Sequence, residues 1–398
     1  MDIDDPDLYA LGDPHALFAE LRRRPGLHWH DEPDGPGFWA LVRHEDAVTA
    51  YRGTDWLTSI RGILLGPNRR SADPAGGRML VMTDPPRHTR LRVVLNRAFT
   101  PRMVQRMHDS LTVAVEHLVE RALAAGRCDF VNDVAAPVPA VMINEMMGVP
   151  RADWERMQEL TRVAFGSSDP SFRRSPSERL SKGGAHAQIL AYHAKLLAER
   201  RRAPGDDLVS VLATAEVEGR PLADAEILLH CDNLIVGGNE TTLHAAAGGL
   251  LALIEHPDQW AALRAEPDLL DSAVEEMLRW TSPAIHVMRT VTREHLVGGQ
   301  TVRPGEQVVI WNISANRDEA VFPEPQAFHV RRSPNRHLTF GIGEHFCIGA
   351  SLARMELRVL FGHLLSRVER VELVGPPERL RSNIVAGYRR LPVALRPR

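Results

Sequence analysis

Helical periodicity restricts the fold of this chain more than any other feature. In the segment 103–125, apolar side chains recur mostly at three- and four-residue spacings, the pattern of a long amphipathic helix: Val104, Met107, Leu111, Val115, Leu118 and Leu123. The same pattern predicts further helices over 187–202, 222–256, 258–266, 268–281 and 348–367. Strand signals are short and few, at Phe38–Val42, Gln307–Trp311 and Arg370–Leu373. The sequence therefore predicts a mainly α protein with a small β region.

Composition agrees with a protein that buries a large core. Of 398 residues, 44% are hydrophobic and 25% charged, and glycine and proline are spread without a long linker, so one domain over 1–398 is expected. A net charge of −3 indicates neither nucleic-acid nor membrane binding. The acidic start is unlike a signal peptide, no apolar run approaches the ~18 residues of a membrane span, and no CxxC pair occurs. We expect a cytoplasmic monomer.

One cysteine stands in an unusual setting, the segment Phe340-Gly341-Ile342-Gly343-Glu344-His345-Phe346-Cys347-Ile348-Gly349. Its first two glycines let the backbone turn sharply. A helix beginning near Ile348 directs backbone amides toward the sulfur, which favours a thiolate. A lone thiolate on such a loop suits one axial bond to heme iron, where sulfur favours O–O cleavage. Most single cysteines are small buried hydrophobes, and we expect that of Cys128 and Cys231.

A second informative stretch lies inside the predicted helix 222–256. Gly237 and Gly238 are adjacent in its interior, where glycine costs about 1 kcal/mol relative to alanine. They precede Thr241 by four and three residues and share its face. A groove there could admit dioxygen above a heme, with the Thr241 hydroxyl bonding the distal oxygen and Glu240 relaying protons. The alternative is close helix packing beside a solvated acid.

These two stretches together resemble the cytochrome P-450 superfamily of heme-thiolate monooxygenases. The Cys347 loop resembles the family's heme-binding loop, and Gly237–Thr242 resembles its oxygen-activation motif. The resemblance implies a single-domain fold in which heme b lies between the oxygen-binding helix and the Cys347 loop. It also implies that Cys347 ligates the iron, that Gly238 adjoins the heme, and that Glu240 and Thr241 are catalytic.

Further matches extend the resemblance over essentially the whole chain. His88, Arg92, Arg289 and His345 occupy the positions that contact the heme propionates in the family. Because a carboxylate needs cationic or donor partners where it is partly buried, four such residues suit two propionates. The alternative for each is a surface cation.

The pair Glu276 and Arg279 is three residues apart on one predicted helix face, a spacing that is common on protein surfaces. Downstream, the run from Asn316 to Arg332 resembles the family segment that supplies a second arginine to this glutamate. By register, Arg332 is a better candidate than Arg331. The resemblance implies a buried structural network without a catalytic role.

Substrate contacts are expected from two segments. Asn233 lies about two turns before Thr241 on the same face, where an amide could bond the substrate or serve as a core residue bonded to backbone. His286, between Arg279 and Arg289, could recognise a polar group or be an edge-facing histidine. The full set of candidates is Asn233, Val236, Gly237, Ile285, His286 and Val287.

Other segments bear on access and partners. Arg61–Arg78 and Gly166–Gly184 lack periodicity, which is typical of lids and mobile loops. In the second, Arg173, Arg174 and Arg179 could meet an acidic carrier protein that holds the substrate. A basic run could form a docking surface for an acidic electron donor or simply a solvated face: Arg87, Arg90, Arg92, Arg97, Arg102 and Arg106.

The resemblance implies a monooxygenase that hydroxylates or epoxidises an organic substrate, as in bacterial secondary-metabolite and antibiotic biosynthesis. The substrate is a small molecule, free or bound to a carrier protein. Electrons are expected from a ferredoxin and its reductase, since the chain shows no flavin or iron–sulfur segment. Two alternatives stay open. One is an oxidative coupling or desaturating enzyme of the same family, and the other is a non-catalytic heme-binding sensor.

Overall fold

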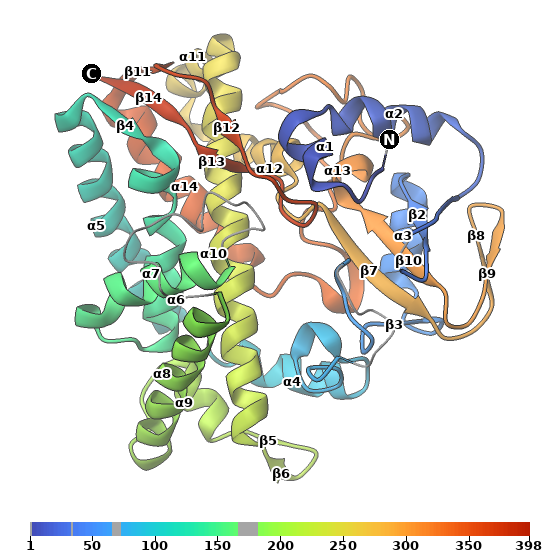
Figure 1. The fold of residues 1–398 in the computed structure, drawn as a ribbon. Helices are drawn as coiled ribbons and strands as arrows, with labels where there is room; N and C mark the ends of the chain where they lie inside the picture. Colours follow the sequence, from blue (N-terminus) through green and yellow to red (C-terminus); the bar gives the residue numbers. More distant parts are fainter. Residues whose placement is uncertain (1, 33–34, 66–72, 166–181) are drawn as a thin grey trace.

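The computed structural model describes residues 2–32, 35–65, 73–165 and 182–398 (Figure 1). The segments predicted to be irregular, Arg61–Arg78 and Gly166–Gly184, lie partly outside these residues, and so do Arg173, Arg174 and Arg179. Helices gather on one side of the molecule and most strands on the other, with the long helix α10 between them (Figure 1).

The helices of the described residues differ widely in length. The long ones are α5 (Pro101–Ala125), α8 (Lys182–Arg202), α10 (Asp224–Glu255) and α14 (Ala350–Arg367). Those of intermediate length are α2 (Pro14–Arg23), α3 (His44–Arg52), α4 (Arg87–Asn96), α6 (Pro137–Met147), α7 (Trp154–Phe165), α11 (Pro257–Ala265) and α12 (Leu270–Thr281). Short turns are α1 (Pro6–Leu11), α9 (Leu208–Ala213), α13 (Asn312–Ala315) and the π-helical segment η2 (Val131–Ala135). The 3-10 turns are η1 (Leu80–Met82), η3 (Arg151–Asp153), η5 (Pro267–Leu269) and η6 (Gly343–His345).

Five strands form the main sheet in the order β1-β2-β10-β7-β3. They are β1 (His28–His30), β2 (Phe38–Leu41), β10 (Gln307–Trp311), β7 (His286–Val291) and β3 (Leu57–Thr58). A three-stranded sheet pairs β11 (Val368–Leu373), β14 (Pro392–Pro397) and β4 (Arg127–Asp129). Three hairpins complete the β structure: β5 (Glu216–Val217) with β6 (Arg220–Pro221), β8 (His295–Val297) with β9 (Gln300–Val302), and β12 (Glu378–Arg379) with β13 (Tyr388–Arg390).

Local sequence explains the ends of the most periodic helix, α5. Thr100 caps it by accepting a hydrogen bond from the backbone N–H of Met103, and Pro101 supplies a preset first residue. Gly126 ends it in a left-handed conformation at φ 68°, which glycine adopts without strain. The buried face of α5 is the predicted apolar stripe, including Met107, Leu111 and Val115, each fully enclosed.

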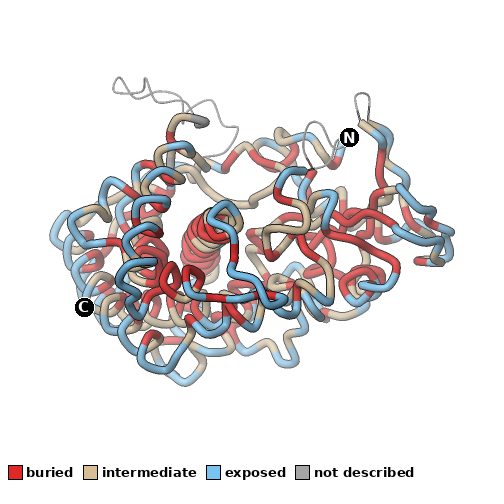
Figure 2. Tube along the Cα trace, turned by 90° about the horizontal axis from the view of Figure 1, so that it is seen from below, coloured by how far each residue is buried: buried red, intermediate tan, exposed pale blue. Residues whose placement is uncertain are grey.

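The largest part of the apolar core lies among the helices. Buried residues run through the middle of the molecule, while exposed ones form its rim (Figure 2). The largest apolar cluster joins α5, α6, α10, α12 and α14, and two smaller clusters cover the two faces of the main sheet. None of the helices formed by the described residues combines the length and apolar character that a membrane crossing requires.

The structure confirms the predicted fold class. Each predicted helix is present within a few residues, and the strands at Phe38, Gln307 and Arg370 correspond to β2, β10 and β11. Arg289 was expected in a strand after Ser282-Pro283, and this strand is β7. Cys231 lies in the main core cluster and Cys128 packs against it, as expected.

Candidate active site

A cavity of about 300 Å³ lies between α10 and the loop that precedes α14. We call it the central cavity. Cys347 lines it together with Gly237, Gly238 and Thr241, which are more than a hundred positions earlier in the chain. The fold therefore brings the two informative sequence stretches to one site.

The Cys347 loop is held by its own backbone. The Cys347 N–H donates to the Phe340 carbonyl at 2.9 Å, which closes the loop. Gly341 and Gly343 have φ of 64° and 73°, so other residues would be strained there. A Cβ at Gly343 would also lie 3.2 Å from the Tyr51 carbonyl oxygen. These glycines are therefore required for the turn against α3 as much as for approach to a ligand.

The environment of the Cys347 sulfur differs from the expectation. The side chain is accessible from the central cavity but is otherwise densely surrounded by protein. Burial raises the pKa of the Cys347 thiol, while the Gly349 N–H and the guanidinium groups of Arg92 and Arg354 act to lower it. The Gly349 amide acts in the predicted direction, but burial of the sulfur outweighs it. A metal cation bonded to the sulfur would reverse this balance.

Four cationic or hydrogen-bond-donor side chains line the same cavity: His88, Arg92, Arg289 and His345. The rings of His88 and His345 lie 4.2 Å apart between centroids. Both nitrogens of the buried His88 ring lack a hydrogen-bond partner among the described residues. Burial lowers the pKa of His345 to about 3, with further contributions from Arg289, His88 and Arg92.

This arrangement fits an anionic group. Arg289 is buried, and Nη1 of its guanidinium group donates to the Met288 backbone carbonyl of the same strand. Burial lowers the pKa of Arg289, because a desolvated cation is unfavourable without a counter-charge. Two carboxylates placed here would supply partners for the buried nitrogens and compensate the clustered charge. The residues present therefore fit the two propionates of heme b.

The two glycines of α10 have different surroundings. A Cβ at Gly238 would lie 2.5 Å from Cδ1 of Ile143 on α6, so this glycine permits close helix packing. A Cβ at Gly237 would meet nothing within 4 Å, so this position opens onto the cavity. One turn later, the Thr241 hydroxyl donates to the Gly237 carbonyl at 2.7 Å. Both interpretations of the glycine pair thus hold, one for each residue.

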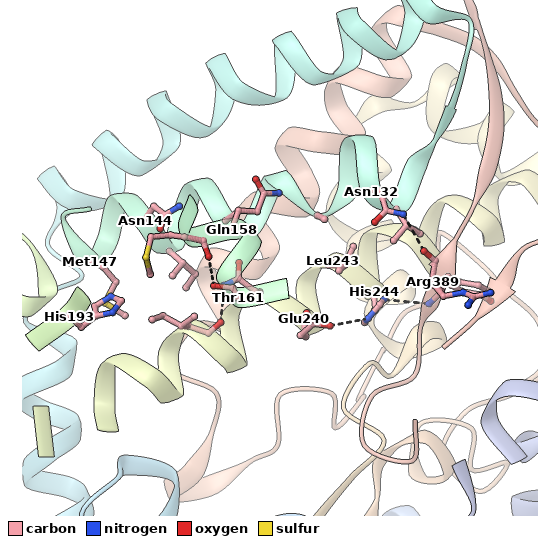
Figure 3. Close-up of a pocket in the computed structure, with 18 residues that line it drawn as sticks. Asn132, Asn144, Met147, Gln158, Thr161, His193, Glu240, Leu243, His244 and Arg389 are labelled. Atoms are coloured by element: carbon pink, nitrogen blue, oxygen red, sulfur yellow. Dashed lines mark hydrogen bonds and ion pairs between the residues drawn. The ribbon is translucent and has the colours of Figure 1, made fainter. Parts of the chain in front are cut away.

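Glu240 does not share a cavity with Thr241. It lines a second cavity, enclosed by α6, α7, η2, α10 and β13 (Figure 3). There its Oε2 lies 3.4 Å from Nε2 of His244 (Figure 3). Adjacent residues of a helix are rotated by about 100°, which places the acid and the alcohol on different faces.

Of the six substrate candidates, three line the central cavity and three do not. Asn233, Gly237 and Val287 line it. Val236, Ile285 and His286 are not among the lining residues, so the structure does not place these three candidates at the cavity. His286 is buried, its Nδ1 donates to the Asn383 carbonyl at 3.0 Å, and its Nε2 accepts from the Leu65 N–H at 3.0 Å. Its role is structural, and Ile285 belongs to the apolar cluster around the sheet.

Strand geometry explains the outcomes for His286 and Val287. Successive side chains of β7 point to opposite faces of the sheet. Arg289 faces the cavity, so Val287 does too, while His286 and Met288 face the other side. The parity relative to Arg289 was present in the sequence and could have excluded His286.

Sequence reasoning missed most of the cavity wall. Met142, Ile143 and Met146 of α6 line the central cavity, as does Tyr51, whose hydroxyl donates to Asn312 Oδ1 at 2.8 Å. The signal that could have identified α6 is its apolar character all round, typical of a helix buried on every side. Tyr51 gave no signal of this kind.

The predicted structural network is present as contacts. Glu276 accepts hydrogen bonds from Arg279 at 2.7 and 2.8 Å and from Arg332 at 3.0 and 3.1 Å. The Glu276 and Arg279 side chains are fully buried. Arg331 instead binds Glu266 at the surface.

The basic run has internal partners. Arg87 and Arg90 pair with Glu218, Arg102 with Asp206, and Arg106 with Glu145. Arg92 lines the central cavity, and Arg97 is exposed. Because carboxylates already compensate most of these charges, the run favours a solvated face over an electron-donor docking surface.

Comparison with known proteins gives a consistent result. Residues 65–387 match the family model described as Cytochrome P450. Linalool 8-monooxygenase of Pseudomonas putida is 36% identical over 100% of this chain and 99% of that protein. Cytochrome P450 NovI of Streptomyces niveus is 37% identical over 99% of this chain and 96% of that protein. The crystal structure of P450 OxyD, described as involved in the biosynthesis of vancomycin-type antibiotics, superposes with a TM-score of 0.92 at 38% identity and covers 100% of both chains.

Proposed function

The chain belongs to the cytochrome P450 family, and on that premise we propose that it oxidises a small, largely apolar substrate in bacterial secondary metabolism. Its class is that of the heme b oxidoreductases that act as monooxygenases. The observation that carries the proposal is a single cavity lined by Cys347, by four cationic or donor side chains and by Thr241. We propose that one domain over residues 1–398 performs this function.

We assign the cofactor-holding roles as follows. Cys347 is the iron ligand, and His88, Arg92, Arg289 and His345 bind the propionates. Gly238 lets α6 and α10 approach each other beside the cofactor. When bound, the heme supplies the binding and activation of dioxygen.

The remaining roles belong to protons and substrate. Thr241 lines the central cavity, where its hydroxyl would hold a proton beside the cofactor, and Glu240 would supply protons from the second cavity. Asn233 is a polar side chain in a wall that Met142, Ile143 and Val287 make apolar. This wall supports a substrate with a large apolar part and one polar group.

The relatives support the same substrate class. One is named for the oxidation of linalool, and OxyD is described as part of antibiotic biosynthesis. We propose small-molecule oxidation with electrons from a ferredoxin and its reductase. A carrier-bound substrate is a further proposal, and the three arginines on which it depends lie outside the described residues.

The test is a binding screen read by the low- to high-spin shift of the ferric heme, with free terpenoids such as linalool and with carrier-loaded compounds. The strongest compounds are then turned over under ¹⁸O₂. One labelled oxygen atom in the product supports monooxygenation. An oxidised product without label indicates coupling or desaturation, and oxidation of none of the bound compounds would contradict the proposed substrate class.

Replacing Arg289 with methionine is expected to weaken heme retention. Losing one buried charge-assisted bond removes about 1.5–3 kcal/mol, which is roughly a 10- to 100-fold faster transfer of heme to an acceptor protein. The matched control is Arg293→Met, just after the same strand, where the arginine binds Asp55 and is exposed. Equal heme loss in both variants would show that Arg289 does not bind the propionates.

A further inference from the structure

Thr241 and Glu240 face different cavities, so proton transfer between them depends on where the Glu240 carboxylate is positioned. Glu240 is partly buried and lines the second cavity with several neutral polar side chains able to hold water: Asn132, Asn144, Gln158 and Thr161. A flexible glutamate that could rotate away from the helix would deliver protons poorly, because proton transfer requires heavy atoms within about 3 Å or one bridging water.

His244 is placed to hold Glu240. It follows Glu240 by four residues, so both lie on one helix face. Its side chain is 3% exposed, and Nε2 lies 3.4 Å from Oε2 of Glu240. Figure 3 shows this contact at the end of the second cavity.

The surroundings of His244 set which nitrogen carries the proton. The backbone N–H of Tyr388 donates to Nδ1 of His244 at 3.4 Å. Nδ1 must therefore keep its lone pair, so the proton of the neutral ring resides on Nε2. That nitrogen makes no hydrogen bond among the described residues, and Oε2 of Glu240 lies 3.4 Å from it, so a small movement of either side chain would bring the carboxylate to its N–H.

The loop before β13 makes room for the ring. A Cβ at Gly387 would lie 2.2 Å from Cγ and 2.3 Å from Nδ1 of His244, so only glycine fits at that position without displacing the ring. The loop is itself anchored, since the Leu380 N–H donates to the Gly387 carbonyl and the Ala386 N–H donates to the Pro283 carbonyl, both at 2.9 Å. The loop at Gly387 thus packs closely against the His244 ring and is held in place by backbone hydrogen bonds.

His244 also lies between two cavities. Together with Tyr388 it lines both the second cavity and a third, more polar cavity of about 550 Å³. Ionisable residues of several elements line this third cavity: Asp13, His15 of α2, Glu255 of α10, Arg317, Arg379 of β12 and Tyr388 of β13. The histidine separates Glu240 from this charged region.

We propose that His244 is a positioning residue for proton delivery: its Nε2–H, fixed by the Tyr388 amide and the Gly387 loop, holds the Glu240 carboxylate where it supplies protons toward Thr241. The proposal rests on the proposed roles of Glu240 and Thr241. It adds a residue from the chain's own second cavity and a distant loop that supports it.

The test measures whether the enzyme reduces dioxygen to hydrogen peroxide or to water, and it needs no organic substrate. NADH, a ferredoxin and its reductase supply electrons to the heme-loaded enzyme. Release of hydrogen peroxide consumes two electrons and two protons per dioxygen, whereas reduction to two waters consumes four of each. The measured quantities are the fraction of electrons recovered in peroxide and the solvent isotope effect on water formation.

His244→Phe keeps a ring but removes the donor. We expect a several-fold larger peroxide fraction and a roughly 10-fold or greater fall in water formation, within the range for loss of acid–base catalysis. His244→Gln, which restores an N–H near the position of Nε2, should recover most of the loss. The matched control is His193→Phe in the wall of the same cavity, whose ring bonds the Ile189 carbonyl and should leave the peroxide fraction unchanged.

The Glu240→Gln variant separates this inference from the proposed function. A peroxide fraction unchanged in Glu240→Gln overturns the proposed proton role of Glu240. A large effect in Glu240→Gln with none in His244→Phe overturns the role of His244 alone. If His244 acts through Glu240, the double variant should be no worse than Glu240→Gln, whereas additive losses would indicate an unrelated structural effect.

A spectroscopic readout is independent of turnover. In the diamagnetic ferrous carbonyl form, long-range ¹⁵N–¹H correlation of the histidines should show His244, assigned by its absence from His244→Phe, as the Nε2–H tautomer. An Nδ1–H tautomer would overturn the proposal.

Discussion

Replacing Cys347 with serine is expected to abolish the red-shifted Soret band of the reduced carbonyl complex together with all monooxygenase turnover. The band depends on a thiolate bond to the iron, and a serine hydroxyl cannot supply it. The substitution is nearly isosteric and the sulfur faces a cavity, so unfolding of the heme-free protein should change by less than about 0.5 kcal/mol. The measurements are the difference spectrum and the thermal unfolding midpoint.

The control for this variant is Cys128→Ser, which alters a half-buried cysteine packed against the core. It should keep the red-shifted band. Retention of the band in Cys347→Ser would show that another residue binds the iron, and would contradict the assignment of the Cys347 loop.

Glu276→Gln is expected to cause the largest loss of stability. The carboxylate accepts hydrogen bonds from Arg279, Arg332, Asn335 and the backbone N–H of His329, and it is fully buried. Its neutralisation leaves two arginines without their shared counter-charge. Breaking a buried ion pair by removing one partner costs about 3–5 kcal/mol.

Glu266→Gln provides a matched comparison for Glu276→Gln. Glu266 binds Arg331, the neighbour of Arg332, through two hydrogen bonds at 2.6 and 2.8 Å, but both side chains are largely exposed. An exposed pair contributes at most about 1 kcal/mol. Urea unfolding followed by far-ultraviolet circular dichroism compares the two variants. Equal shifts of the unfolding midpoint in the two variants would mean that burial of the Glu276 network adds nothing to the stability of the protein.

Most secondary structure could be predicted because its signals are local. The apolar stripe of α5, with its threonine cap, proline start and glycine end, is contained in 25 consecutive residues and their neighbours. The pairing of β7 with β10 over five residues joins two separate segments, and no local pattern specifies it. The sequence spacing of His286 and Arg289 places them on opposite faces of a strand, but the packing of the sheet decides which face meets the cavity.

The site was predictable to the extent that it is built from continuous segments. The turn at Gly341 and Gly343 and the face shared by Gly237 and Thr241 follow from backbone geometry within a few residues. The apolar wall contributed by α6 and the hydroxyl of Tyr51 do not, because they reach the cavity through helix packing. Ile285 does not line the cavity, since its side chain joins the apolar cluster that includes Met288 and Trp311 of the main sheet.

By itself the sequence determined the helical class, the cysteine loop and the identity of the acid and the alcohol on α10, since each depends on spacings along one element. Only the tertiary structure decided which cavity each of them faces. The acid lies 3.4 Å from Nε2 of His244, whose orientation depends on Tyr388, 144 positions away, and on a glycine beside it. Contacts between elements arise from packing over the whole chain, so the spacing of residues along α10 carries no record of them.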